Sequence, residues 1–300
     1  MTCMISSFGK RSGRVFRTCV LALACLAIAV HPAFGQGLLD QIRGDVRTSN
    51  RDRPPAPAES PPPSDCGDSC RPKYSYNDSA EYVREGLFSG VFWLSVAAAA
   101  APFLGPHAIV GDDFSVTRSF ARFPYDGDSG YMSLYGGKGW AAQFSSDYAT
   151  EFNDLDQVGG RLRIDTLSRW GIDTDMKYFQ ESVPAAARDS LWLGDCNITY
   201  RFAQGENMQW RTGLGFNWMD DADKSDFGFN FTYGFDWFPR RPWVVSAEID
   251  WGTLGHSGLF HFRGTVGAML NRLEAYTGYE YYDFDDVQTN MLIGGVRIWF

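Results

Sequence analysis

The sequence predicts an all-β protein, an antiparallel up-and-down β-barrel of about ten strands, preceded by a disordered linker and one short helix. Three observations support this prediction. From Trp140 onward, apolar and polar residues alternate with a period of two, which indicates half-buried strands. The length of each turn agrees with whether the apolar residues keep or change their even or odd positions from one strand to the next. Aromatic residues gather near the ends of the apolar faces.

The composition excludes several classes of protein. Aromatic residues make up 16% of the 300 residues, yet the mean hydropathy is −0.26 and 21% of the residues are charged. Disorder of the whole chain is excluded because disordered chains lack aromatic residues. A bundle of membrane helices is excluded because each helix needs about 20 apolar residues, and the low mean hydropathy leaves no room for several such runs. The formal net charge of −9 argues against a nucleic-acid partner, which would require a basic surface.

Residues 1–35 are predicted to be a secretory signal peptide. Basic residues between Lys10 and Arg17 precede the uncharged run Val20–Val30, and Ala33-Phe34-Gly35 supplies small residues for cleavage. Eleven apolar residues are too few to cross a bilayer as a helix, so export is favoured over a membrane anchor.

Residues 36–79 are predicted to be a proline-rich, disordered periplasmic linker. Cys66 and Cys70 lie within it, close enough for a small disulfide loop in an oxidising compartment.

Residues 80–139 are predicted to form an apolar helix and an irregular lead-in. No charge occurs between Leu87 and Leu104, and this length only just meets the requirement for a membrane helix. Glycine and serine dilute the segment, and Pro102 and Pro106 end it. This favours a helix packed in or beneath the following domain over a true span.

The barrel domain is predicted to occupy residues 140–300. The apolar residues change from even to odd positions across Asn271-Arg272, as a two-residue turn requires. They keep their parity across two predicted three-residue turns, one holding Gly171 and one at Gln204-Gly205-Glu206. Short turns alternate along the chain with generally longer connections such as SVPAAARDS, TLGHSG and DFDDVQT. Short periplasmic turns and longer outer loops are typical of outer-membrane barrels, and an even number of strands puts both ends of the barrel on the periplasmic side.

The two faces of the strands favour a transmembrane barrel over a soluble periplasmic barrel or sandwich that binds a small ligand. Aromatic residues at the ends of the apolar face are expected at the two bilayer interfaces. The other face carries charges of both signs, which should pair across a narrow lumen. We predict a lumen charge network of Arg161, Arg163, Asp165, Arg201, Arg211, Asp236, Glu248, Asp250, Arg263, Glu274, Glu280 and Arg297.

The C-terminal strand ends in Phe300, with Ile298 and Val296 on the same face. This end resembles the signal by which bacterial outer-membrane β-barrels are recognised for assembly, and residues 140–300 resemble those proteins as a whole. The resemblance implies location in the outer membrane, with membrane lipid and the barrel-assembly machinery as partners. The stretches RFPYDGDSGYM, DSLWLGD and GVRIWF are also similar to a group of exported proteins of planctomycete bacteria, and that resemblance implies no function.

The sequence therefore predicts an integral outer-membrane barrel of structural, small-pore or surface-interaction type, with no catalytic chemistry, cofactor or metal. The alternative within the membrane is a hydrolase acting on lipid or peptide at the outer mouth. His256, Ser257 and Asp250 are weak candidates for it, because their spacing does not match the His-x-Ser of barrel lipid hydrolases and the omptin Asp-x-His is absent.

The predicted outer loops are acidic. They favour a solvated surface over a weak divalent-cation site, since no ligand spacing matches a known loop. The residues concerned are Asp154, Asp156, Asp220, Asp221, Asp223, Asp226, Asp283, Asp285 and Asp286.

Overall fold

The computed structural model describes residues 37–48, 100–113, 115–126, 130–133, 136–152, 155–182 and 189–300. The predicted signal peptide up to Gly35 and the predicted Cys66–Cys70 disulfide lie outside the described residues. Most of the uncharged stretch that begins at Leu87 also lies outside them.

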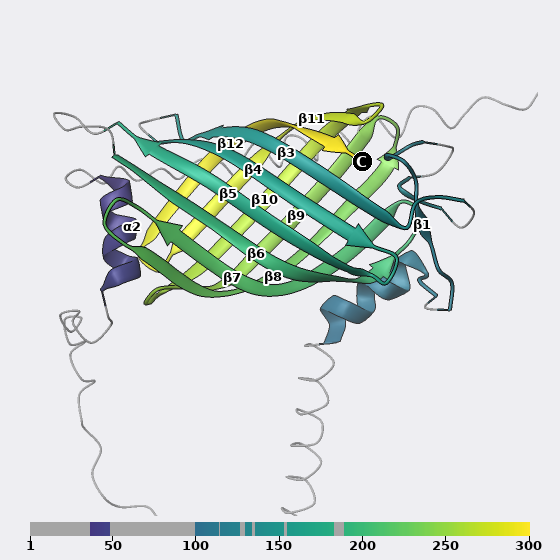
Figure 1. The fold of residues 1–300 in the computed structure, drawn as a ribbon, viewed down its shortest axis with the longest axis horizontal. Helices are drawn as coiled ribbons and strands as arrows, with labels where there is room; N and C mark the ends of the chain where they lie inside the picture. The colour runs from purple at the N-terminus through teal and green to yellow at the C-terminus, as the bar shows by residue number, and fades with distance from the viewer. Residues whose placement is uncertain are drawn as a thin grey trace, which may run out of the picture. The chain divides into compact units, whose positions relative to one another are not determined.

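Ten of the described strands form one closed antiparallel barrel (Figure 1). Each strand pairs with its neighbours in the sequence, and the first and last strands of the barrel, β3 and β12, pair to close it. The predicted fold class is confirmed. The strands are β3 (Trp140–Thr150), β4 (Leu155–Thr166), β5 (Trp170–Glu181), β6 (Asp189–Gln204), β7 (Met208–Asp220), β8 (Ser225–Arg240), β9 (Trp243–Leu254), β10 (Ser257–Leu270), β11 (Leu273–Phe284) and β12 (Val287–Trp299).

The alternation of side chains puts apolar residues on the outer wall and polar residues in the lumen. In β8, Phe227 and Phe229 are 63% and 52% exposed, whereas Asp226, Asn230 and Asp236 of the other parity are buried. Successive side chains of a strand point to opposite faces, so one parity must face outward along the whole strand. The outward and inward faces of the strands that the sequence predicts are therefore the ones found in the structure.

The turns at the C-terminal end of the barrel, which we call the turn end, are short. The predicted turn Asn271-Arg272 is present, with Asn271 at a positive φ of 55°. Gly171 lies within β5, and the three-residue turn before it is 167–169, so the predicted position of that turn was wrong. Likewise Gln204 is the last residue of β6, and the turn that follows is 205–207.

The connections at the opposite end, which we call the loop end, are not uniformly long. Only two residues, 255–256, join β9 to β10, and only 285–286 join β11 to β12. The prediction of longer loops there was wrong because the strands continue to pair, as far as Leu254 with Ser257 and Phe284 with Val287. The connections between β3 and β4, β5 and β6, and β7 and β8 are longer.

Two segments before the barrel are helical. Helix α2 (Leu38–Arg47) falls within the predicted disordered linker, so that prediction was wrong for these residues. Residues 100–110 are also helical and belong to the predicted helix and lead-in, which continues with β1 (Ser119–Phe120) and β2 (Met132–Ser133). In the part of the chain that is described, no helix has the length and hydropathy needed to span a bilayer.

Candidate functional site

Helix α2 closes the loop end of the barrel (Figure 1). Leu39, Ile42 and Val46 recur at helical spacing and are almost completely buried. They pack into an apolar collar made by inward-facing side chains of the barrel, chiefly Leu155, Phe179, Leu191, Leu193, Met219, Leu254, Leu259, Phe284 and Val287. The chain thus fills the mouth of its own barrel with an amphipathic helix.

Polar contacts fix α2 in the mouth at both of its ends. The backbone N–H groups of Leu38 and Leu39 donate to Glu181 at 2.7 and 3.0 Å, where a carboxylate is favoured by the unpaired N–H groups and the dipole of a helix N-terminus. At the other end, the backbone N–H of His256 donates to the carbonyl oxygen of Val46 at 2.8 Å.

Two arginines of α2 bind carboxylates at the rim. Arg43 pairs with Asp189 at 2.6 Å and with Asp221 at 2.7 Å, and Arg47 pairs with Asp226 at 2.9 Å. The hydrogen bonds to Asp189 and Asp221 raise the pKa of Arg43 although burial opposes its charge. Burial alone would raise the pKa of Asp221, but the hydrogen bonds donated by Arg47, by backbone N–H groups and by Arg43 lower it.

A second apolar cluster closes the turn end. Phe120 and Tyr131 of the lead-in pack with Phe238 and Trp299, which point inward from β8 and β12, and all four are at most 1% exposed. The indole N–H of Trp299 donates to Glu274 at 2.9 Å, so its polar atom is satisfied. The lead-in is therefore a second plug, which we call the turn-end plug.

An ion pair and a buried tyrosine attach the lead-in to the strands. Asp112 accepts hydrogen bonds from Arg169 at 2.6 and 2.9 Å. The hydroxyl of Tyr125 donates to the carbonyl oxygen of Trp243, and burial raises the pKa of Tyr125 to about 12. These contacts hold the turn-end plug to the barrel at two separate places.

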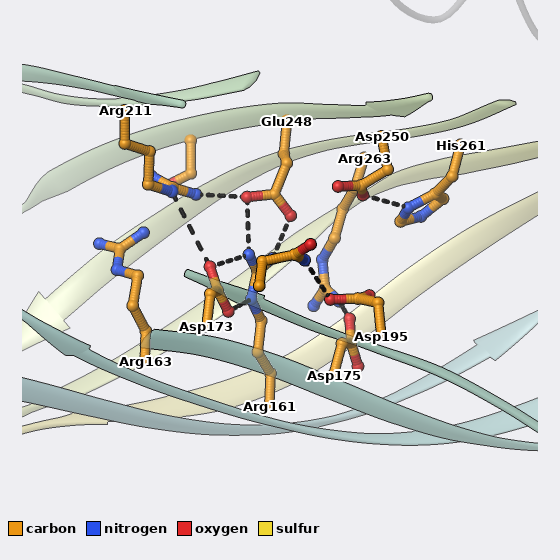
Figure 2. A network of polar contacts seen from close by, with 12 residues as sticks. Arg161, Arg163, Asp173, Asp175, Asp195, Arg211, Glu248, Asp250, His261 and Arg263 are labelled. Atoms are coloured by element: carbon orange, nitrogen blue, oxygen red, sulfur yellow. Dashed lines mark hydrogen bonds and ion pairs between the residues drawn. The ribbon is translucent and has the colours of Figure 1, made fainter. Parts of the chain in front are cut away.

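A network of paired charges fills the lumen between the two plugs (Figure 2). Arg161 binds Asp173 on the neighbouring strand at 2.7 Å and reaches Glu248 on the opposite wall at 2.6 Å. Arg211 also binds Glu248 at 2.6 Å and binds Asp236 at 2.9 Å. Buried charges are tolerated only when paired and hydrogen-bonded, and here Glu248 and Asp236 each accept hydrogen bonds from two arginines.

Other pairs cross the lumen at neighbouring levels. Arg163 of β4 binds Asp236 of β8 at 2.6 Å, and Arg263 of β10 binds Asp147 of β3 at 2.6 Å. The hydroxyl of Tyr276 donates to the same oxygen of Asp147 at 2.9 Å. Side chains from opposite walls thus meet in the middle, and the network ties the barrel together across its diameter.

Nearer the loop end, His261 lies between two carboxylates. Its Nδ1 is 2.8 Å from Asp250, its Nε2 is 2.8 Å from Glu280, and its ring stacks on Tyr282 with centroids 4.3 Å apart. Lys177 pairs with Glu280 and donates to Tyr282. Both ring nitrogens of His261 therefore lie within hydrogen-bond distance of a carboxylate.

The three weak catalytic candidates are not assembled. Asp250 binds His261 deep in the lumen, Ser257 donates to Asp285 at 3.0 Å, and His256 lies in the turn against α2. Among the described residues, no hydrogen bond joins any two of Asp250, His256 and Ser257. A nucleophile needs its base within hydrogen-bond reach, so this arrangement offers no triad.

The structure places all twelve residues of the predicted charge network in the lumen. Arg201 pairs with Asp165 at 2.8 Å and Arg297 with Glu274 at 3.2 Å, which completes the set. The predicted set omits His261, although its parity places it on the inner face. It also omits α2, whose apolar spacing at Leu39, Ile42 and Val46 was the available signal.

Two cavities in the lumen measure about 20 Å³ each, which is enough for a water molecule and little else. The acidic rim is partly neutralised by α2, since Asp221 and Asp226 bind arginine. Within the described ranges, no three histidine, cysteine, aspartate or glutamate side chains are arranged to hold a metal ion.

The outer wall carries the complementary property, an apolar surface around the barrel. Outward-facing aromatic rings lie near both strand ends, among them Trp251 and Trp192 at the loop end and Trp140, Trp170 and Trp243 at the turn end. Between them lie exposed aliphatic side chains. A closed barrel with an apolar exterior, aromatic belts and a charged interior is the architecture of a membrane β-barrel protein.

Solved structures with a similar fold include an autotransporter β domain, an outer membrane protein and a porin. No family model and no curated protein matches the sequence. The β domain of the Bordetella autotransporter BrkA is 13% identical with a TM-score of 0.33, over 54% of this chain and 98% of that one. The Yersinia pestis outer membrane protein Ail is 14% identical with a TM-score of 0.31, over 54% and 100%. The NanC porin is 8% identical with a TM-score of 0.33, over 52% and 98%.

Proposed function

We propose that this protein is an integral outer-membrane barrel of structural or surface-interaction type, which acts through its wall and loop end and is closed to solutes. The observation that carries this proposal is the filled lumen. Apolar plugs close both ends, and paired charges from opposite walls occupy the centre. A barrel of about eight to ten strands has an interior just wide enough for side chains, which agrees with a packed rather than an open lumen.

Planar-bilayer recording tests whether the lumen is closed. The purified full-length protein should give no conductance above background, because apolar clusters close both ends of the lumen and the two cavities in it are about 20 Å³ each. A variant with Arg161→Ala and Arg263→Ala, which removes cross-lumen side chains, is the comparison. Steady conductance of the unmodified protein would overturn the proposal and favour the small-pore interpretation.

Membrane integration has a separate test. The apolar outer wall should keep the protein in the membrane fraction through carbonate and salt washes, and the folded barrel should migrate faster on gels before heating than after it. Release by either wash would show that the outer wall does not contact lipid. It would support the alternative of a soluble periplasmic barrel.

The C-terminal strand supports recognition by the barrel-assembly machinery. Val296, Ile298 and Phe300 are 46%, 37% and 40% exposed on the outer wall at the turn end. Removal of the final ring by Phe300→Ala should lower the amount of assembled barrel without changing its heat-modified migration once assembled. The matched control is Leu270→Ala, which shortens an outward side chain at the same end of the barrel.

A further inference from the structure

The helix at 100–110 lies outside the ring of strands, beside the turn end of the barrel (Figure 1). One of its faces packs on the outer wall, where the ring of Phe103 lies against Phe202 and Tyr233 with centroids 5.2 and 6.1 Å apart. Phe202 also packs on the outward-facing Tyr233, with centroids 5.7 Å apart, and is only 8% exposed. The helix therefore covers this part of the wall.

The opposite face of this helix is exposed and apolar. Leu104 and Ile109 are 66% and 71% exposed, and the other exposed residues of the helix are alanine, proline and phenylalanine. Residues 100–110 include no aspartate, glutamate, lysine or arginine. A helix that is apolar on all sides belongs in a protein core or in a membrane. Helix α2 shows the contrast, since it turns the charged Asp40 outward.

Pro106 leaves one carbonyl of the helix without its usual donor. In a regular helix the carbonyl oxygen of Pro102 accepts from the N–H group of residue 106, and proline has none. The hydroxyl of Tyr233, on the outer wall, donates to this oxygen at 2.6 Å. Water would solvate such a carbonyl at a water-facing surface, whereas in lipid a neighbouring side chain must supply the donor. The wall thus supplies the donor that a lipid environment requires.

We propose that the helix at 100–110 lies in the membrane, in the leaflet at the turn end of the barrel, with its exposed face against the acyl chains of the lipid. This rests on the proposed membrane location. Tyr233 pairs with Ile249 in the middle of β9, and Val110 lies against the turn residue Gly205. The helix therefore follows the outer wall from its central part to the turns, and its exposed face continues the apolar surface of the wall.

Lipid is the partner that the surrounding surface favours. The outward residues farther along the same two strands, Ile198 of β6 and Trp237 of β8, are 62% and 41% exposed and apolar. A protein partner usually meets an apolar centre with a polar rim. The exposed residues of the helix provide no charged group for such a rim.

Nitroxide labels in lipid vesicles test where the exposed face lies. In a chain whose native cysteines are all replaced by serine, single labels are attached at Leu104→Cys and Ile109→Cys. Both labels should be relaxed more by oxygen, which dissolves in lipid, than by a water-soluble nickel chelate. Both positions are exposed, so the substitutions should leave the barrel folded, and heat-modifiable migration on gels checks this.

Two further labels provide the references for lipid and for water. Leu214→Cys lies on the outer wall, where Leu214 is 57% exposed, and should also be relaxed mainly by oxygen. Gly44→Cys lies on the exposed face of α2, where an added side chain meets no atom within 4 Å. It is the matched helical control, and it should be relaxed mainly by nickel.

Three results would overturn the proposal. Relaxation of the Leu104→Cys and Ile109→Cys labels mainly by nickel, with Leu214→Cys relaxed mainly by oxygen, would place the helix in water and leave the membrane barrel standing. Shielding of the two helix labels from both reagents would mean that protein, such as a second copy of the chain, covers the face. Relaxation mainly by nickel at Leu214→Cys as well would overturn the proposed membrane location together with the placement of the helix.

The hydrogen bond from Tyr233 gives an independent test. Tyr233→Phe keeps the ring that packs on Phe103 and leaves the carbonyl of Pro102 without a donor. In lipid, this loss should increase the undocked fraction of the helix about 5- to 150-fold, measured as faster amide exchange of the helix in vesicles. If water reaches the carbonyl, a water molecule replaces the hydroxyl, so a change below about threefold would overturn the proposal. The control is Tyr281→Phe, an outward tyrosine that bonds elsewhere, and it should leave this exchange unchanged.

Discussion

The contact of Ile42 with the apolar collar should decide whether α2 stays in the mouth of the barrel. Ile42 is 3% exposed and lies at the centre of the buried face of α2. A helix of ten residues is marginal in water on its own, so its order depends on docking. The substitution Ile42→Ala removes three carbons from the collar and leaves the charged contacts of α2 in place.

The expected size follows from the burial. Replacing a fully buried isoleucine by alanine costs about 2–5 kcal/mol, and every 1.4 kcal/mol changes an equilibrium about tenfold. The fraction of molecules in which α2 is undocked should therefore increase by a factor of between about 30 and a few thousand. Hydrogen exchange of the amides of α2 measures this directly, because exchange through local opening reports its free energy.

The control is a substitution on the same helix that should slow the exchange of α2 rather than accelerate it. Gly44 is exposed, and a Cβ built there would meet no atom within 4 Å. Alanine is favoured over glycine in a helix by about 0.5–1 kcal/mol, so Gly44→Ala should slow the same exchange by about two- to fivefold. An acceleration of less than threefold in Ile42→Ala, or equal acceleration in both variants, would refute the reasoning.

Two further outcomes follow from the charged contacts. Because the pKa of Asp221 is lowered in the folded protein, its contribution to docking is full above about pH 4 and lost as the pH falls below it. Exchange of α2, corrected for the intrinsic rate, should rise between pH 4 and 2, and Arg47→Gln should weaken that rise. In the lumen, Arg263→Ala leaves the buried Asp147 without its cation, which should destabilise the folded barrel by about 3–5 kcal/mol. The temperature at which the gel band shifts from the folded to the unfolded position should therefore fall. The exposed Arg122→Ala should leave that temperature unchanged.

The strands could be predicted because their period of two is a local property of the sequence. Phe227 and Phe229 lie on one face of their strand and Asp226 lies on the other, whatever the rest of the chain does. The ends of strands are less local. The residues around Gly255 and Asp285 have the composition of loops, yet the strands pair up to them because their neighbours extend equally far.

Helix α2 could not be predicted from its surroundings alone. Leu39, Ile42 and Val46 have helical spacing, but the segment precedes a long run of proline and polar residues. Its stability comes from a collar that is assembled by strands more than a hundred residues later in the sequence. Propensity and local pattern cannot include that contribution.

The members of the lumen network were predictable, but their partners were not. Parity places Arg163 and Asp236 on the inner face, and the pair is formed across 73 positions of the chain. Lys177 and Glu280 meet across 103 positions. Which cation faces which anion depends on the tilt and stagger of the closed barrel, and these are properties of the whole ring of strands.

The two plugs also determine how the protein responds to ionic strength. Counter-ions screen charges that they can approach, with a Debye length near 8 Å at physiological salt. The arginines and carboxylates of the lumen are separated from both solutions by α2 on one side and by the cluster around Trp299 on the other. A protein rich in ion pairs should therefore melt at nearly the same temperature in dilute buffer and in molar salt. Dissolved ions would reach the ion pairs of the lumen only when one of the two plugs is withdrawn.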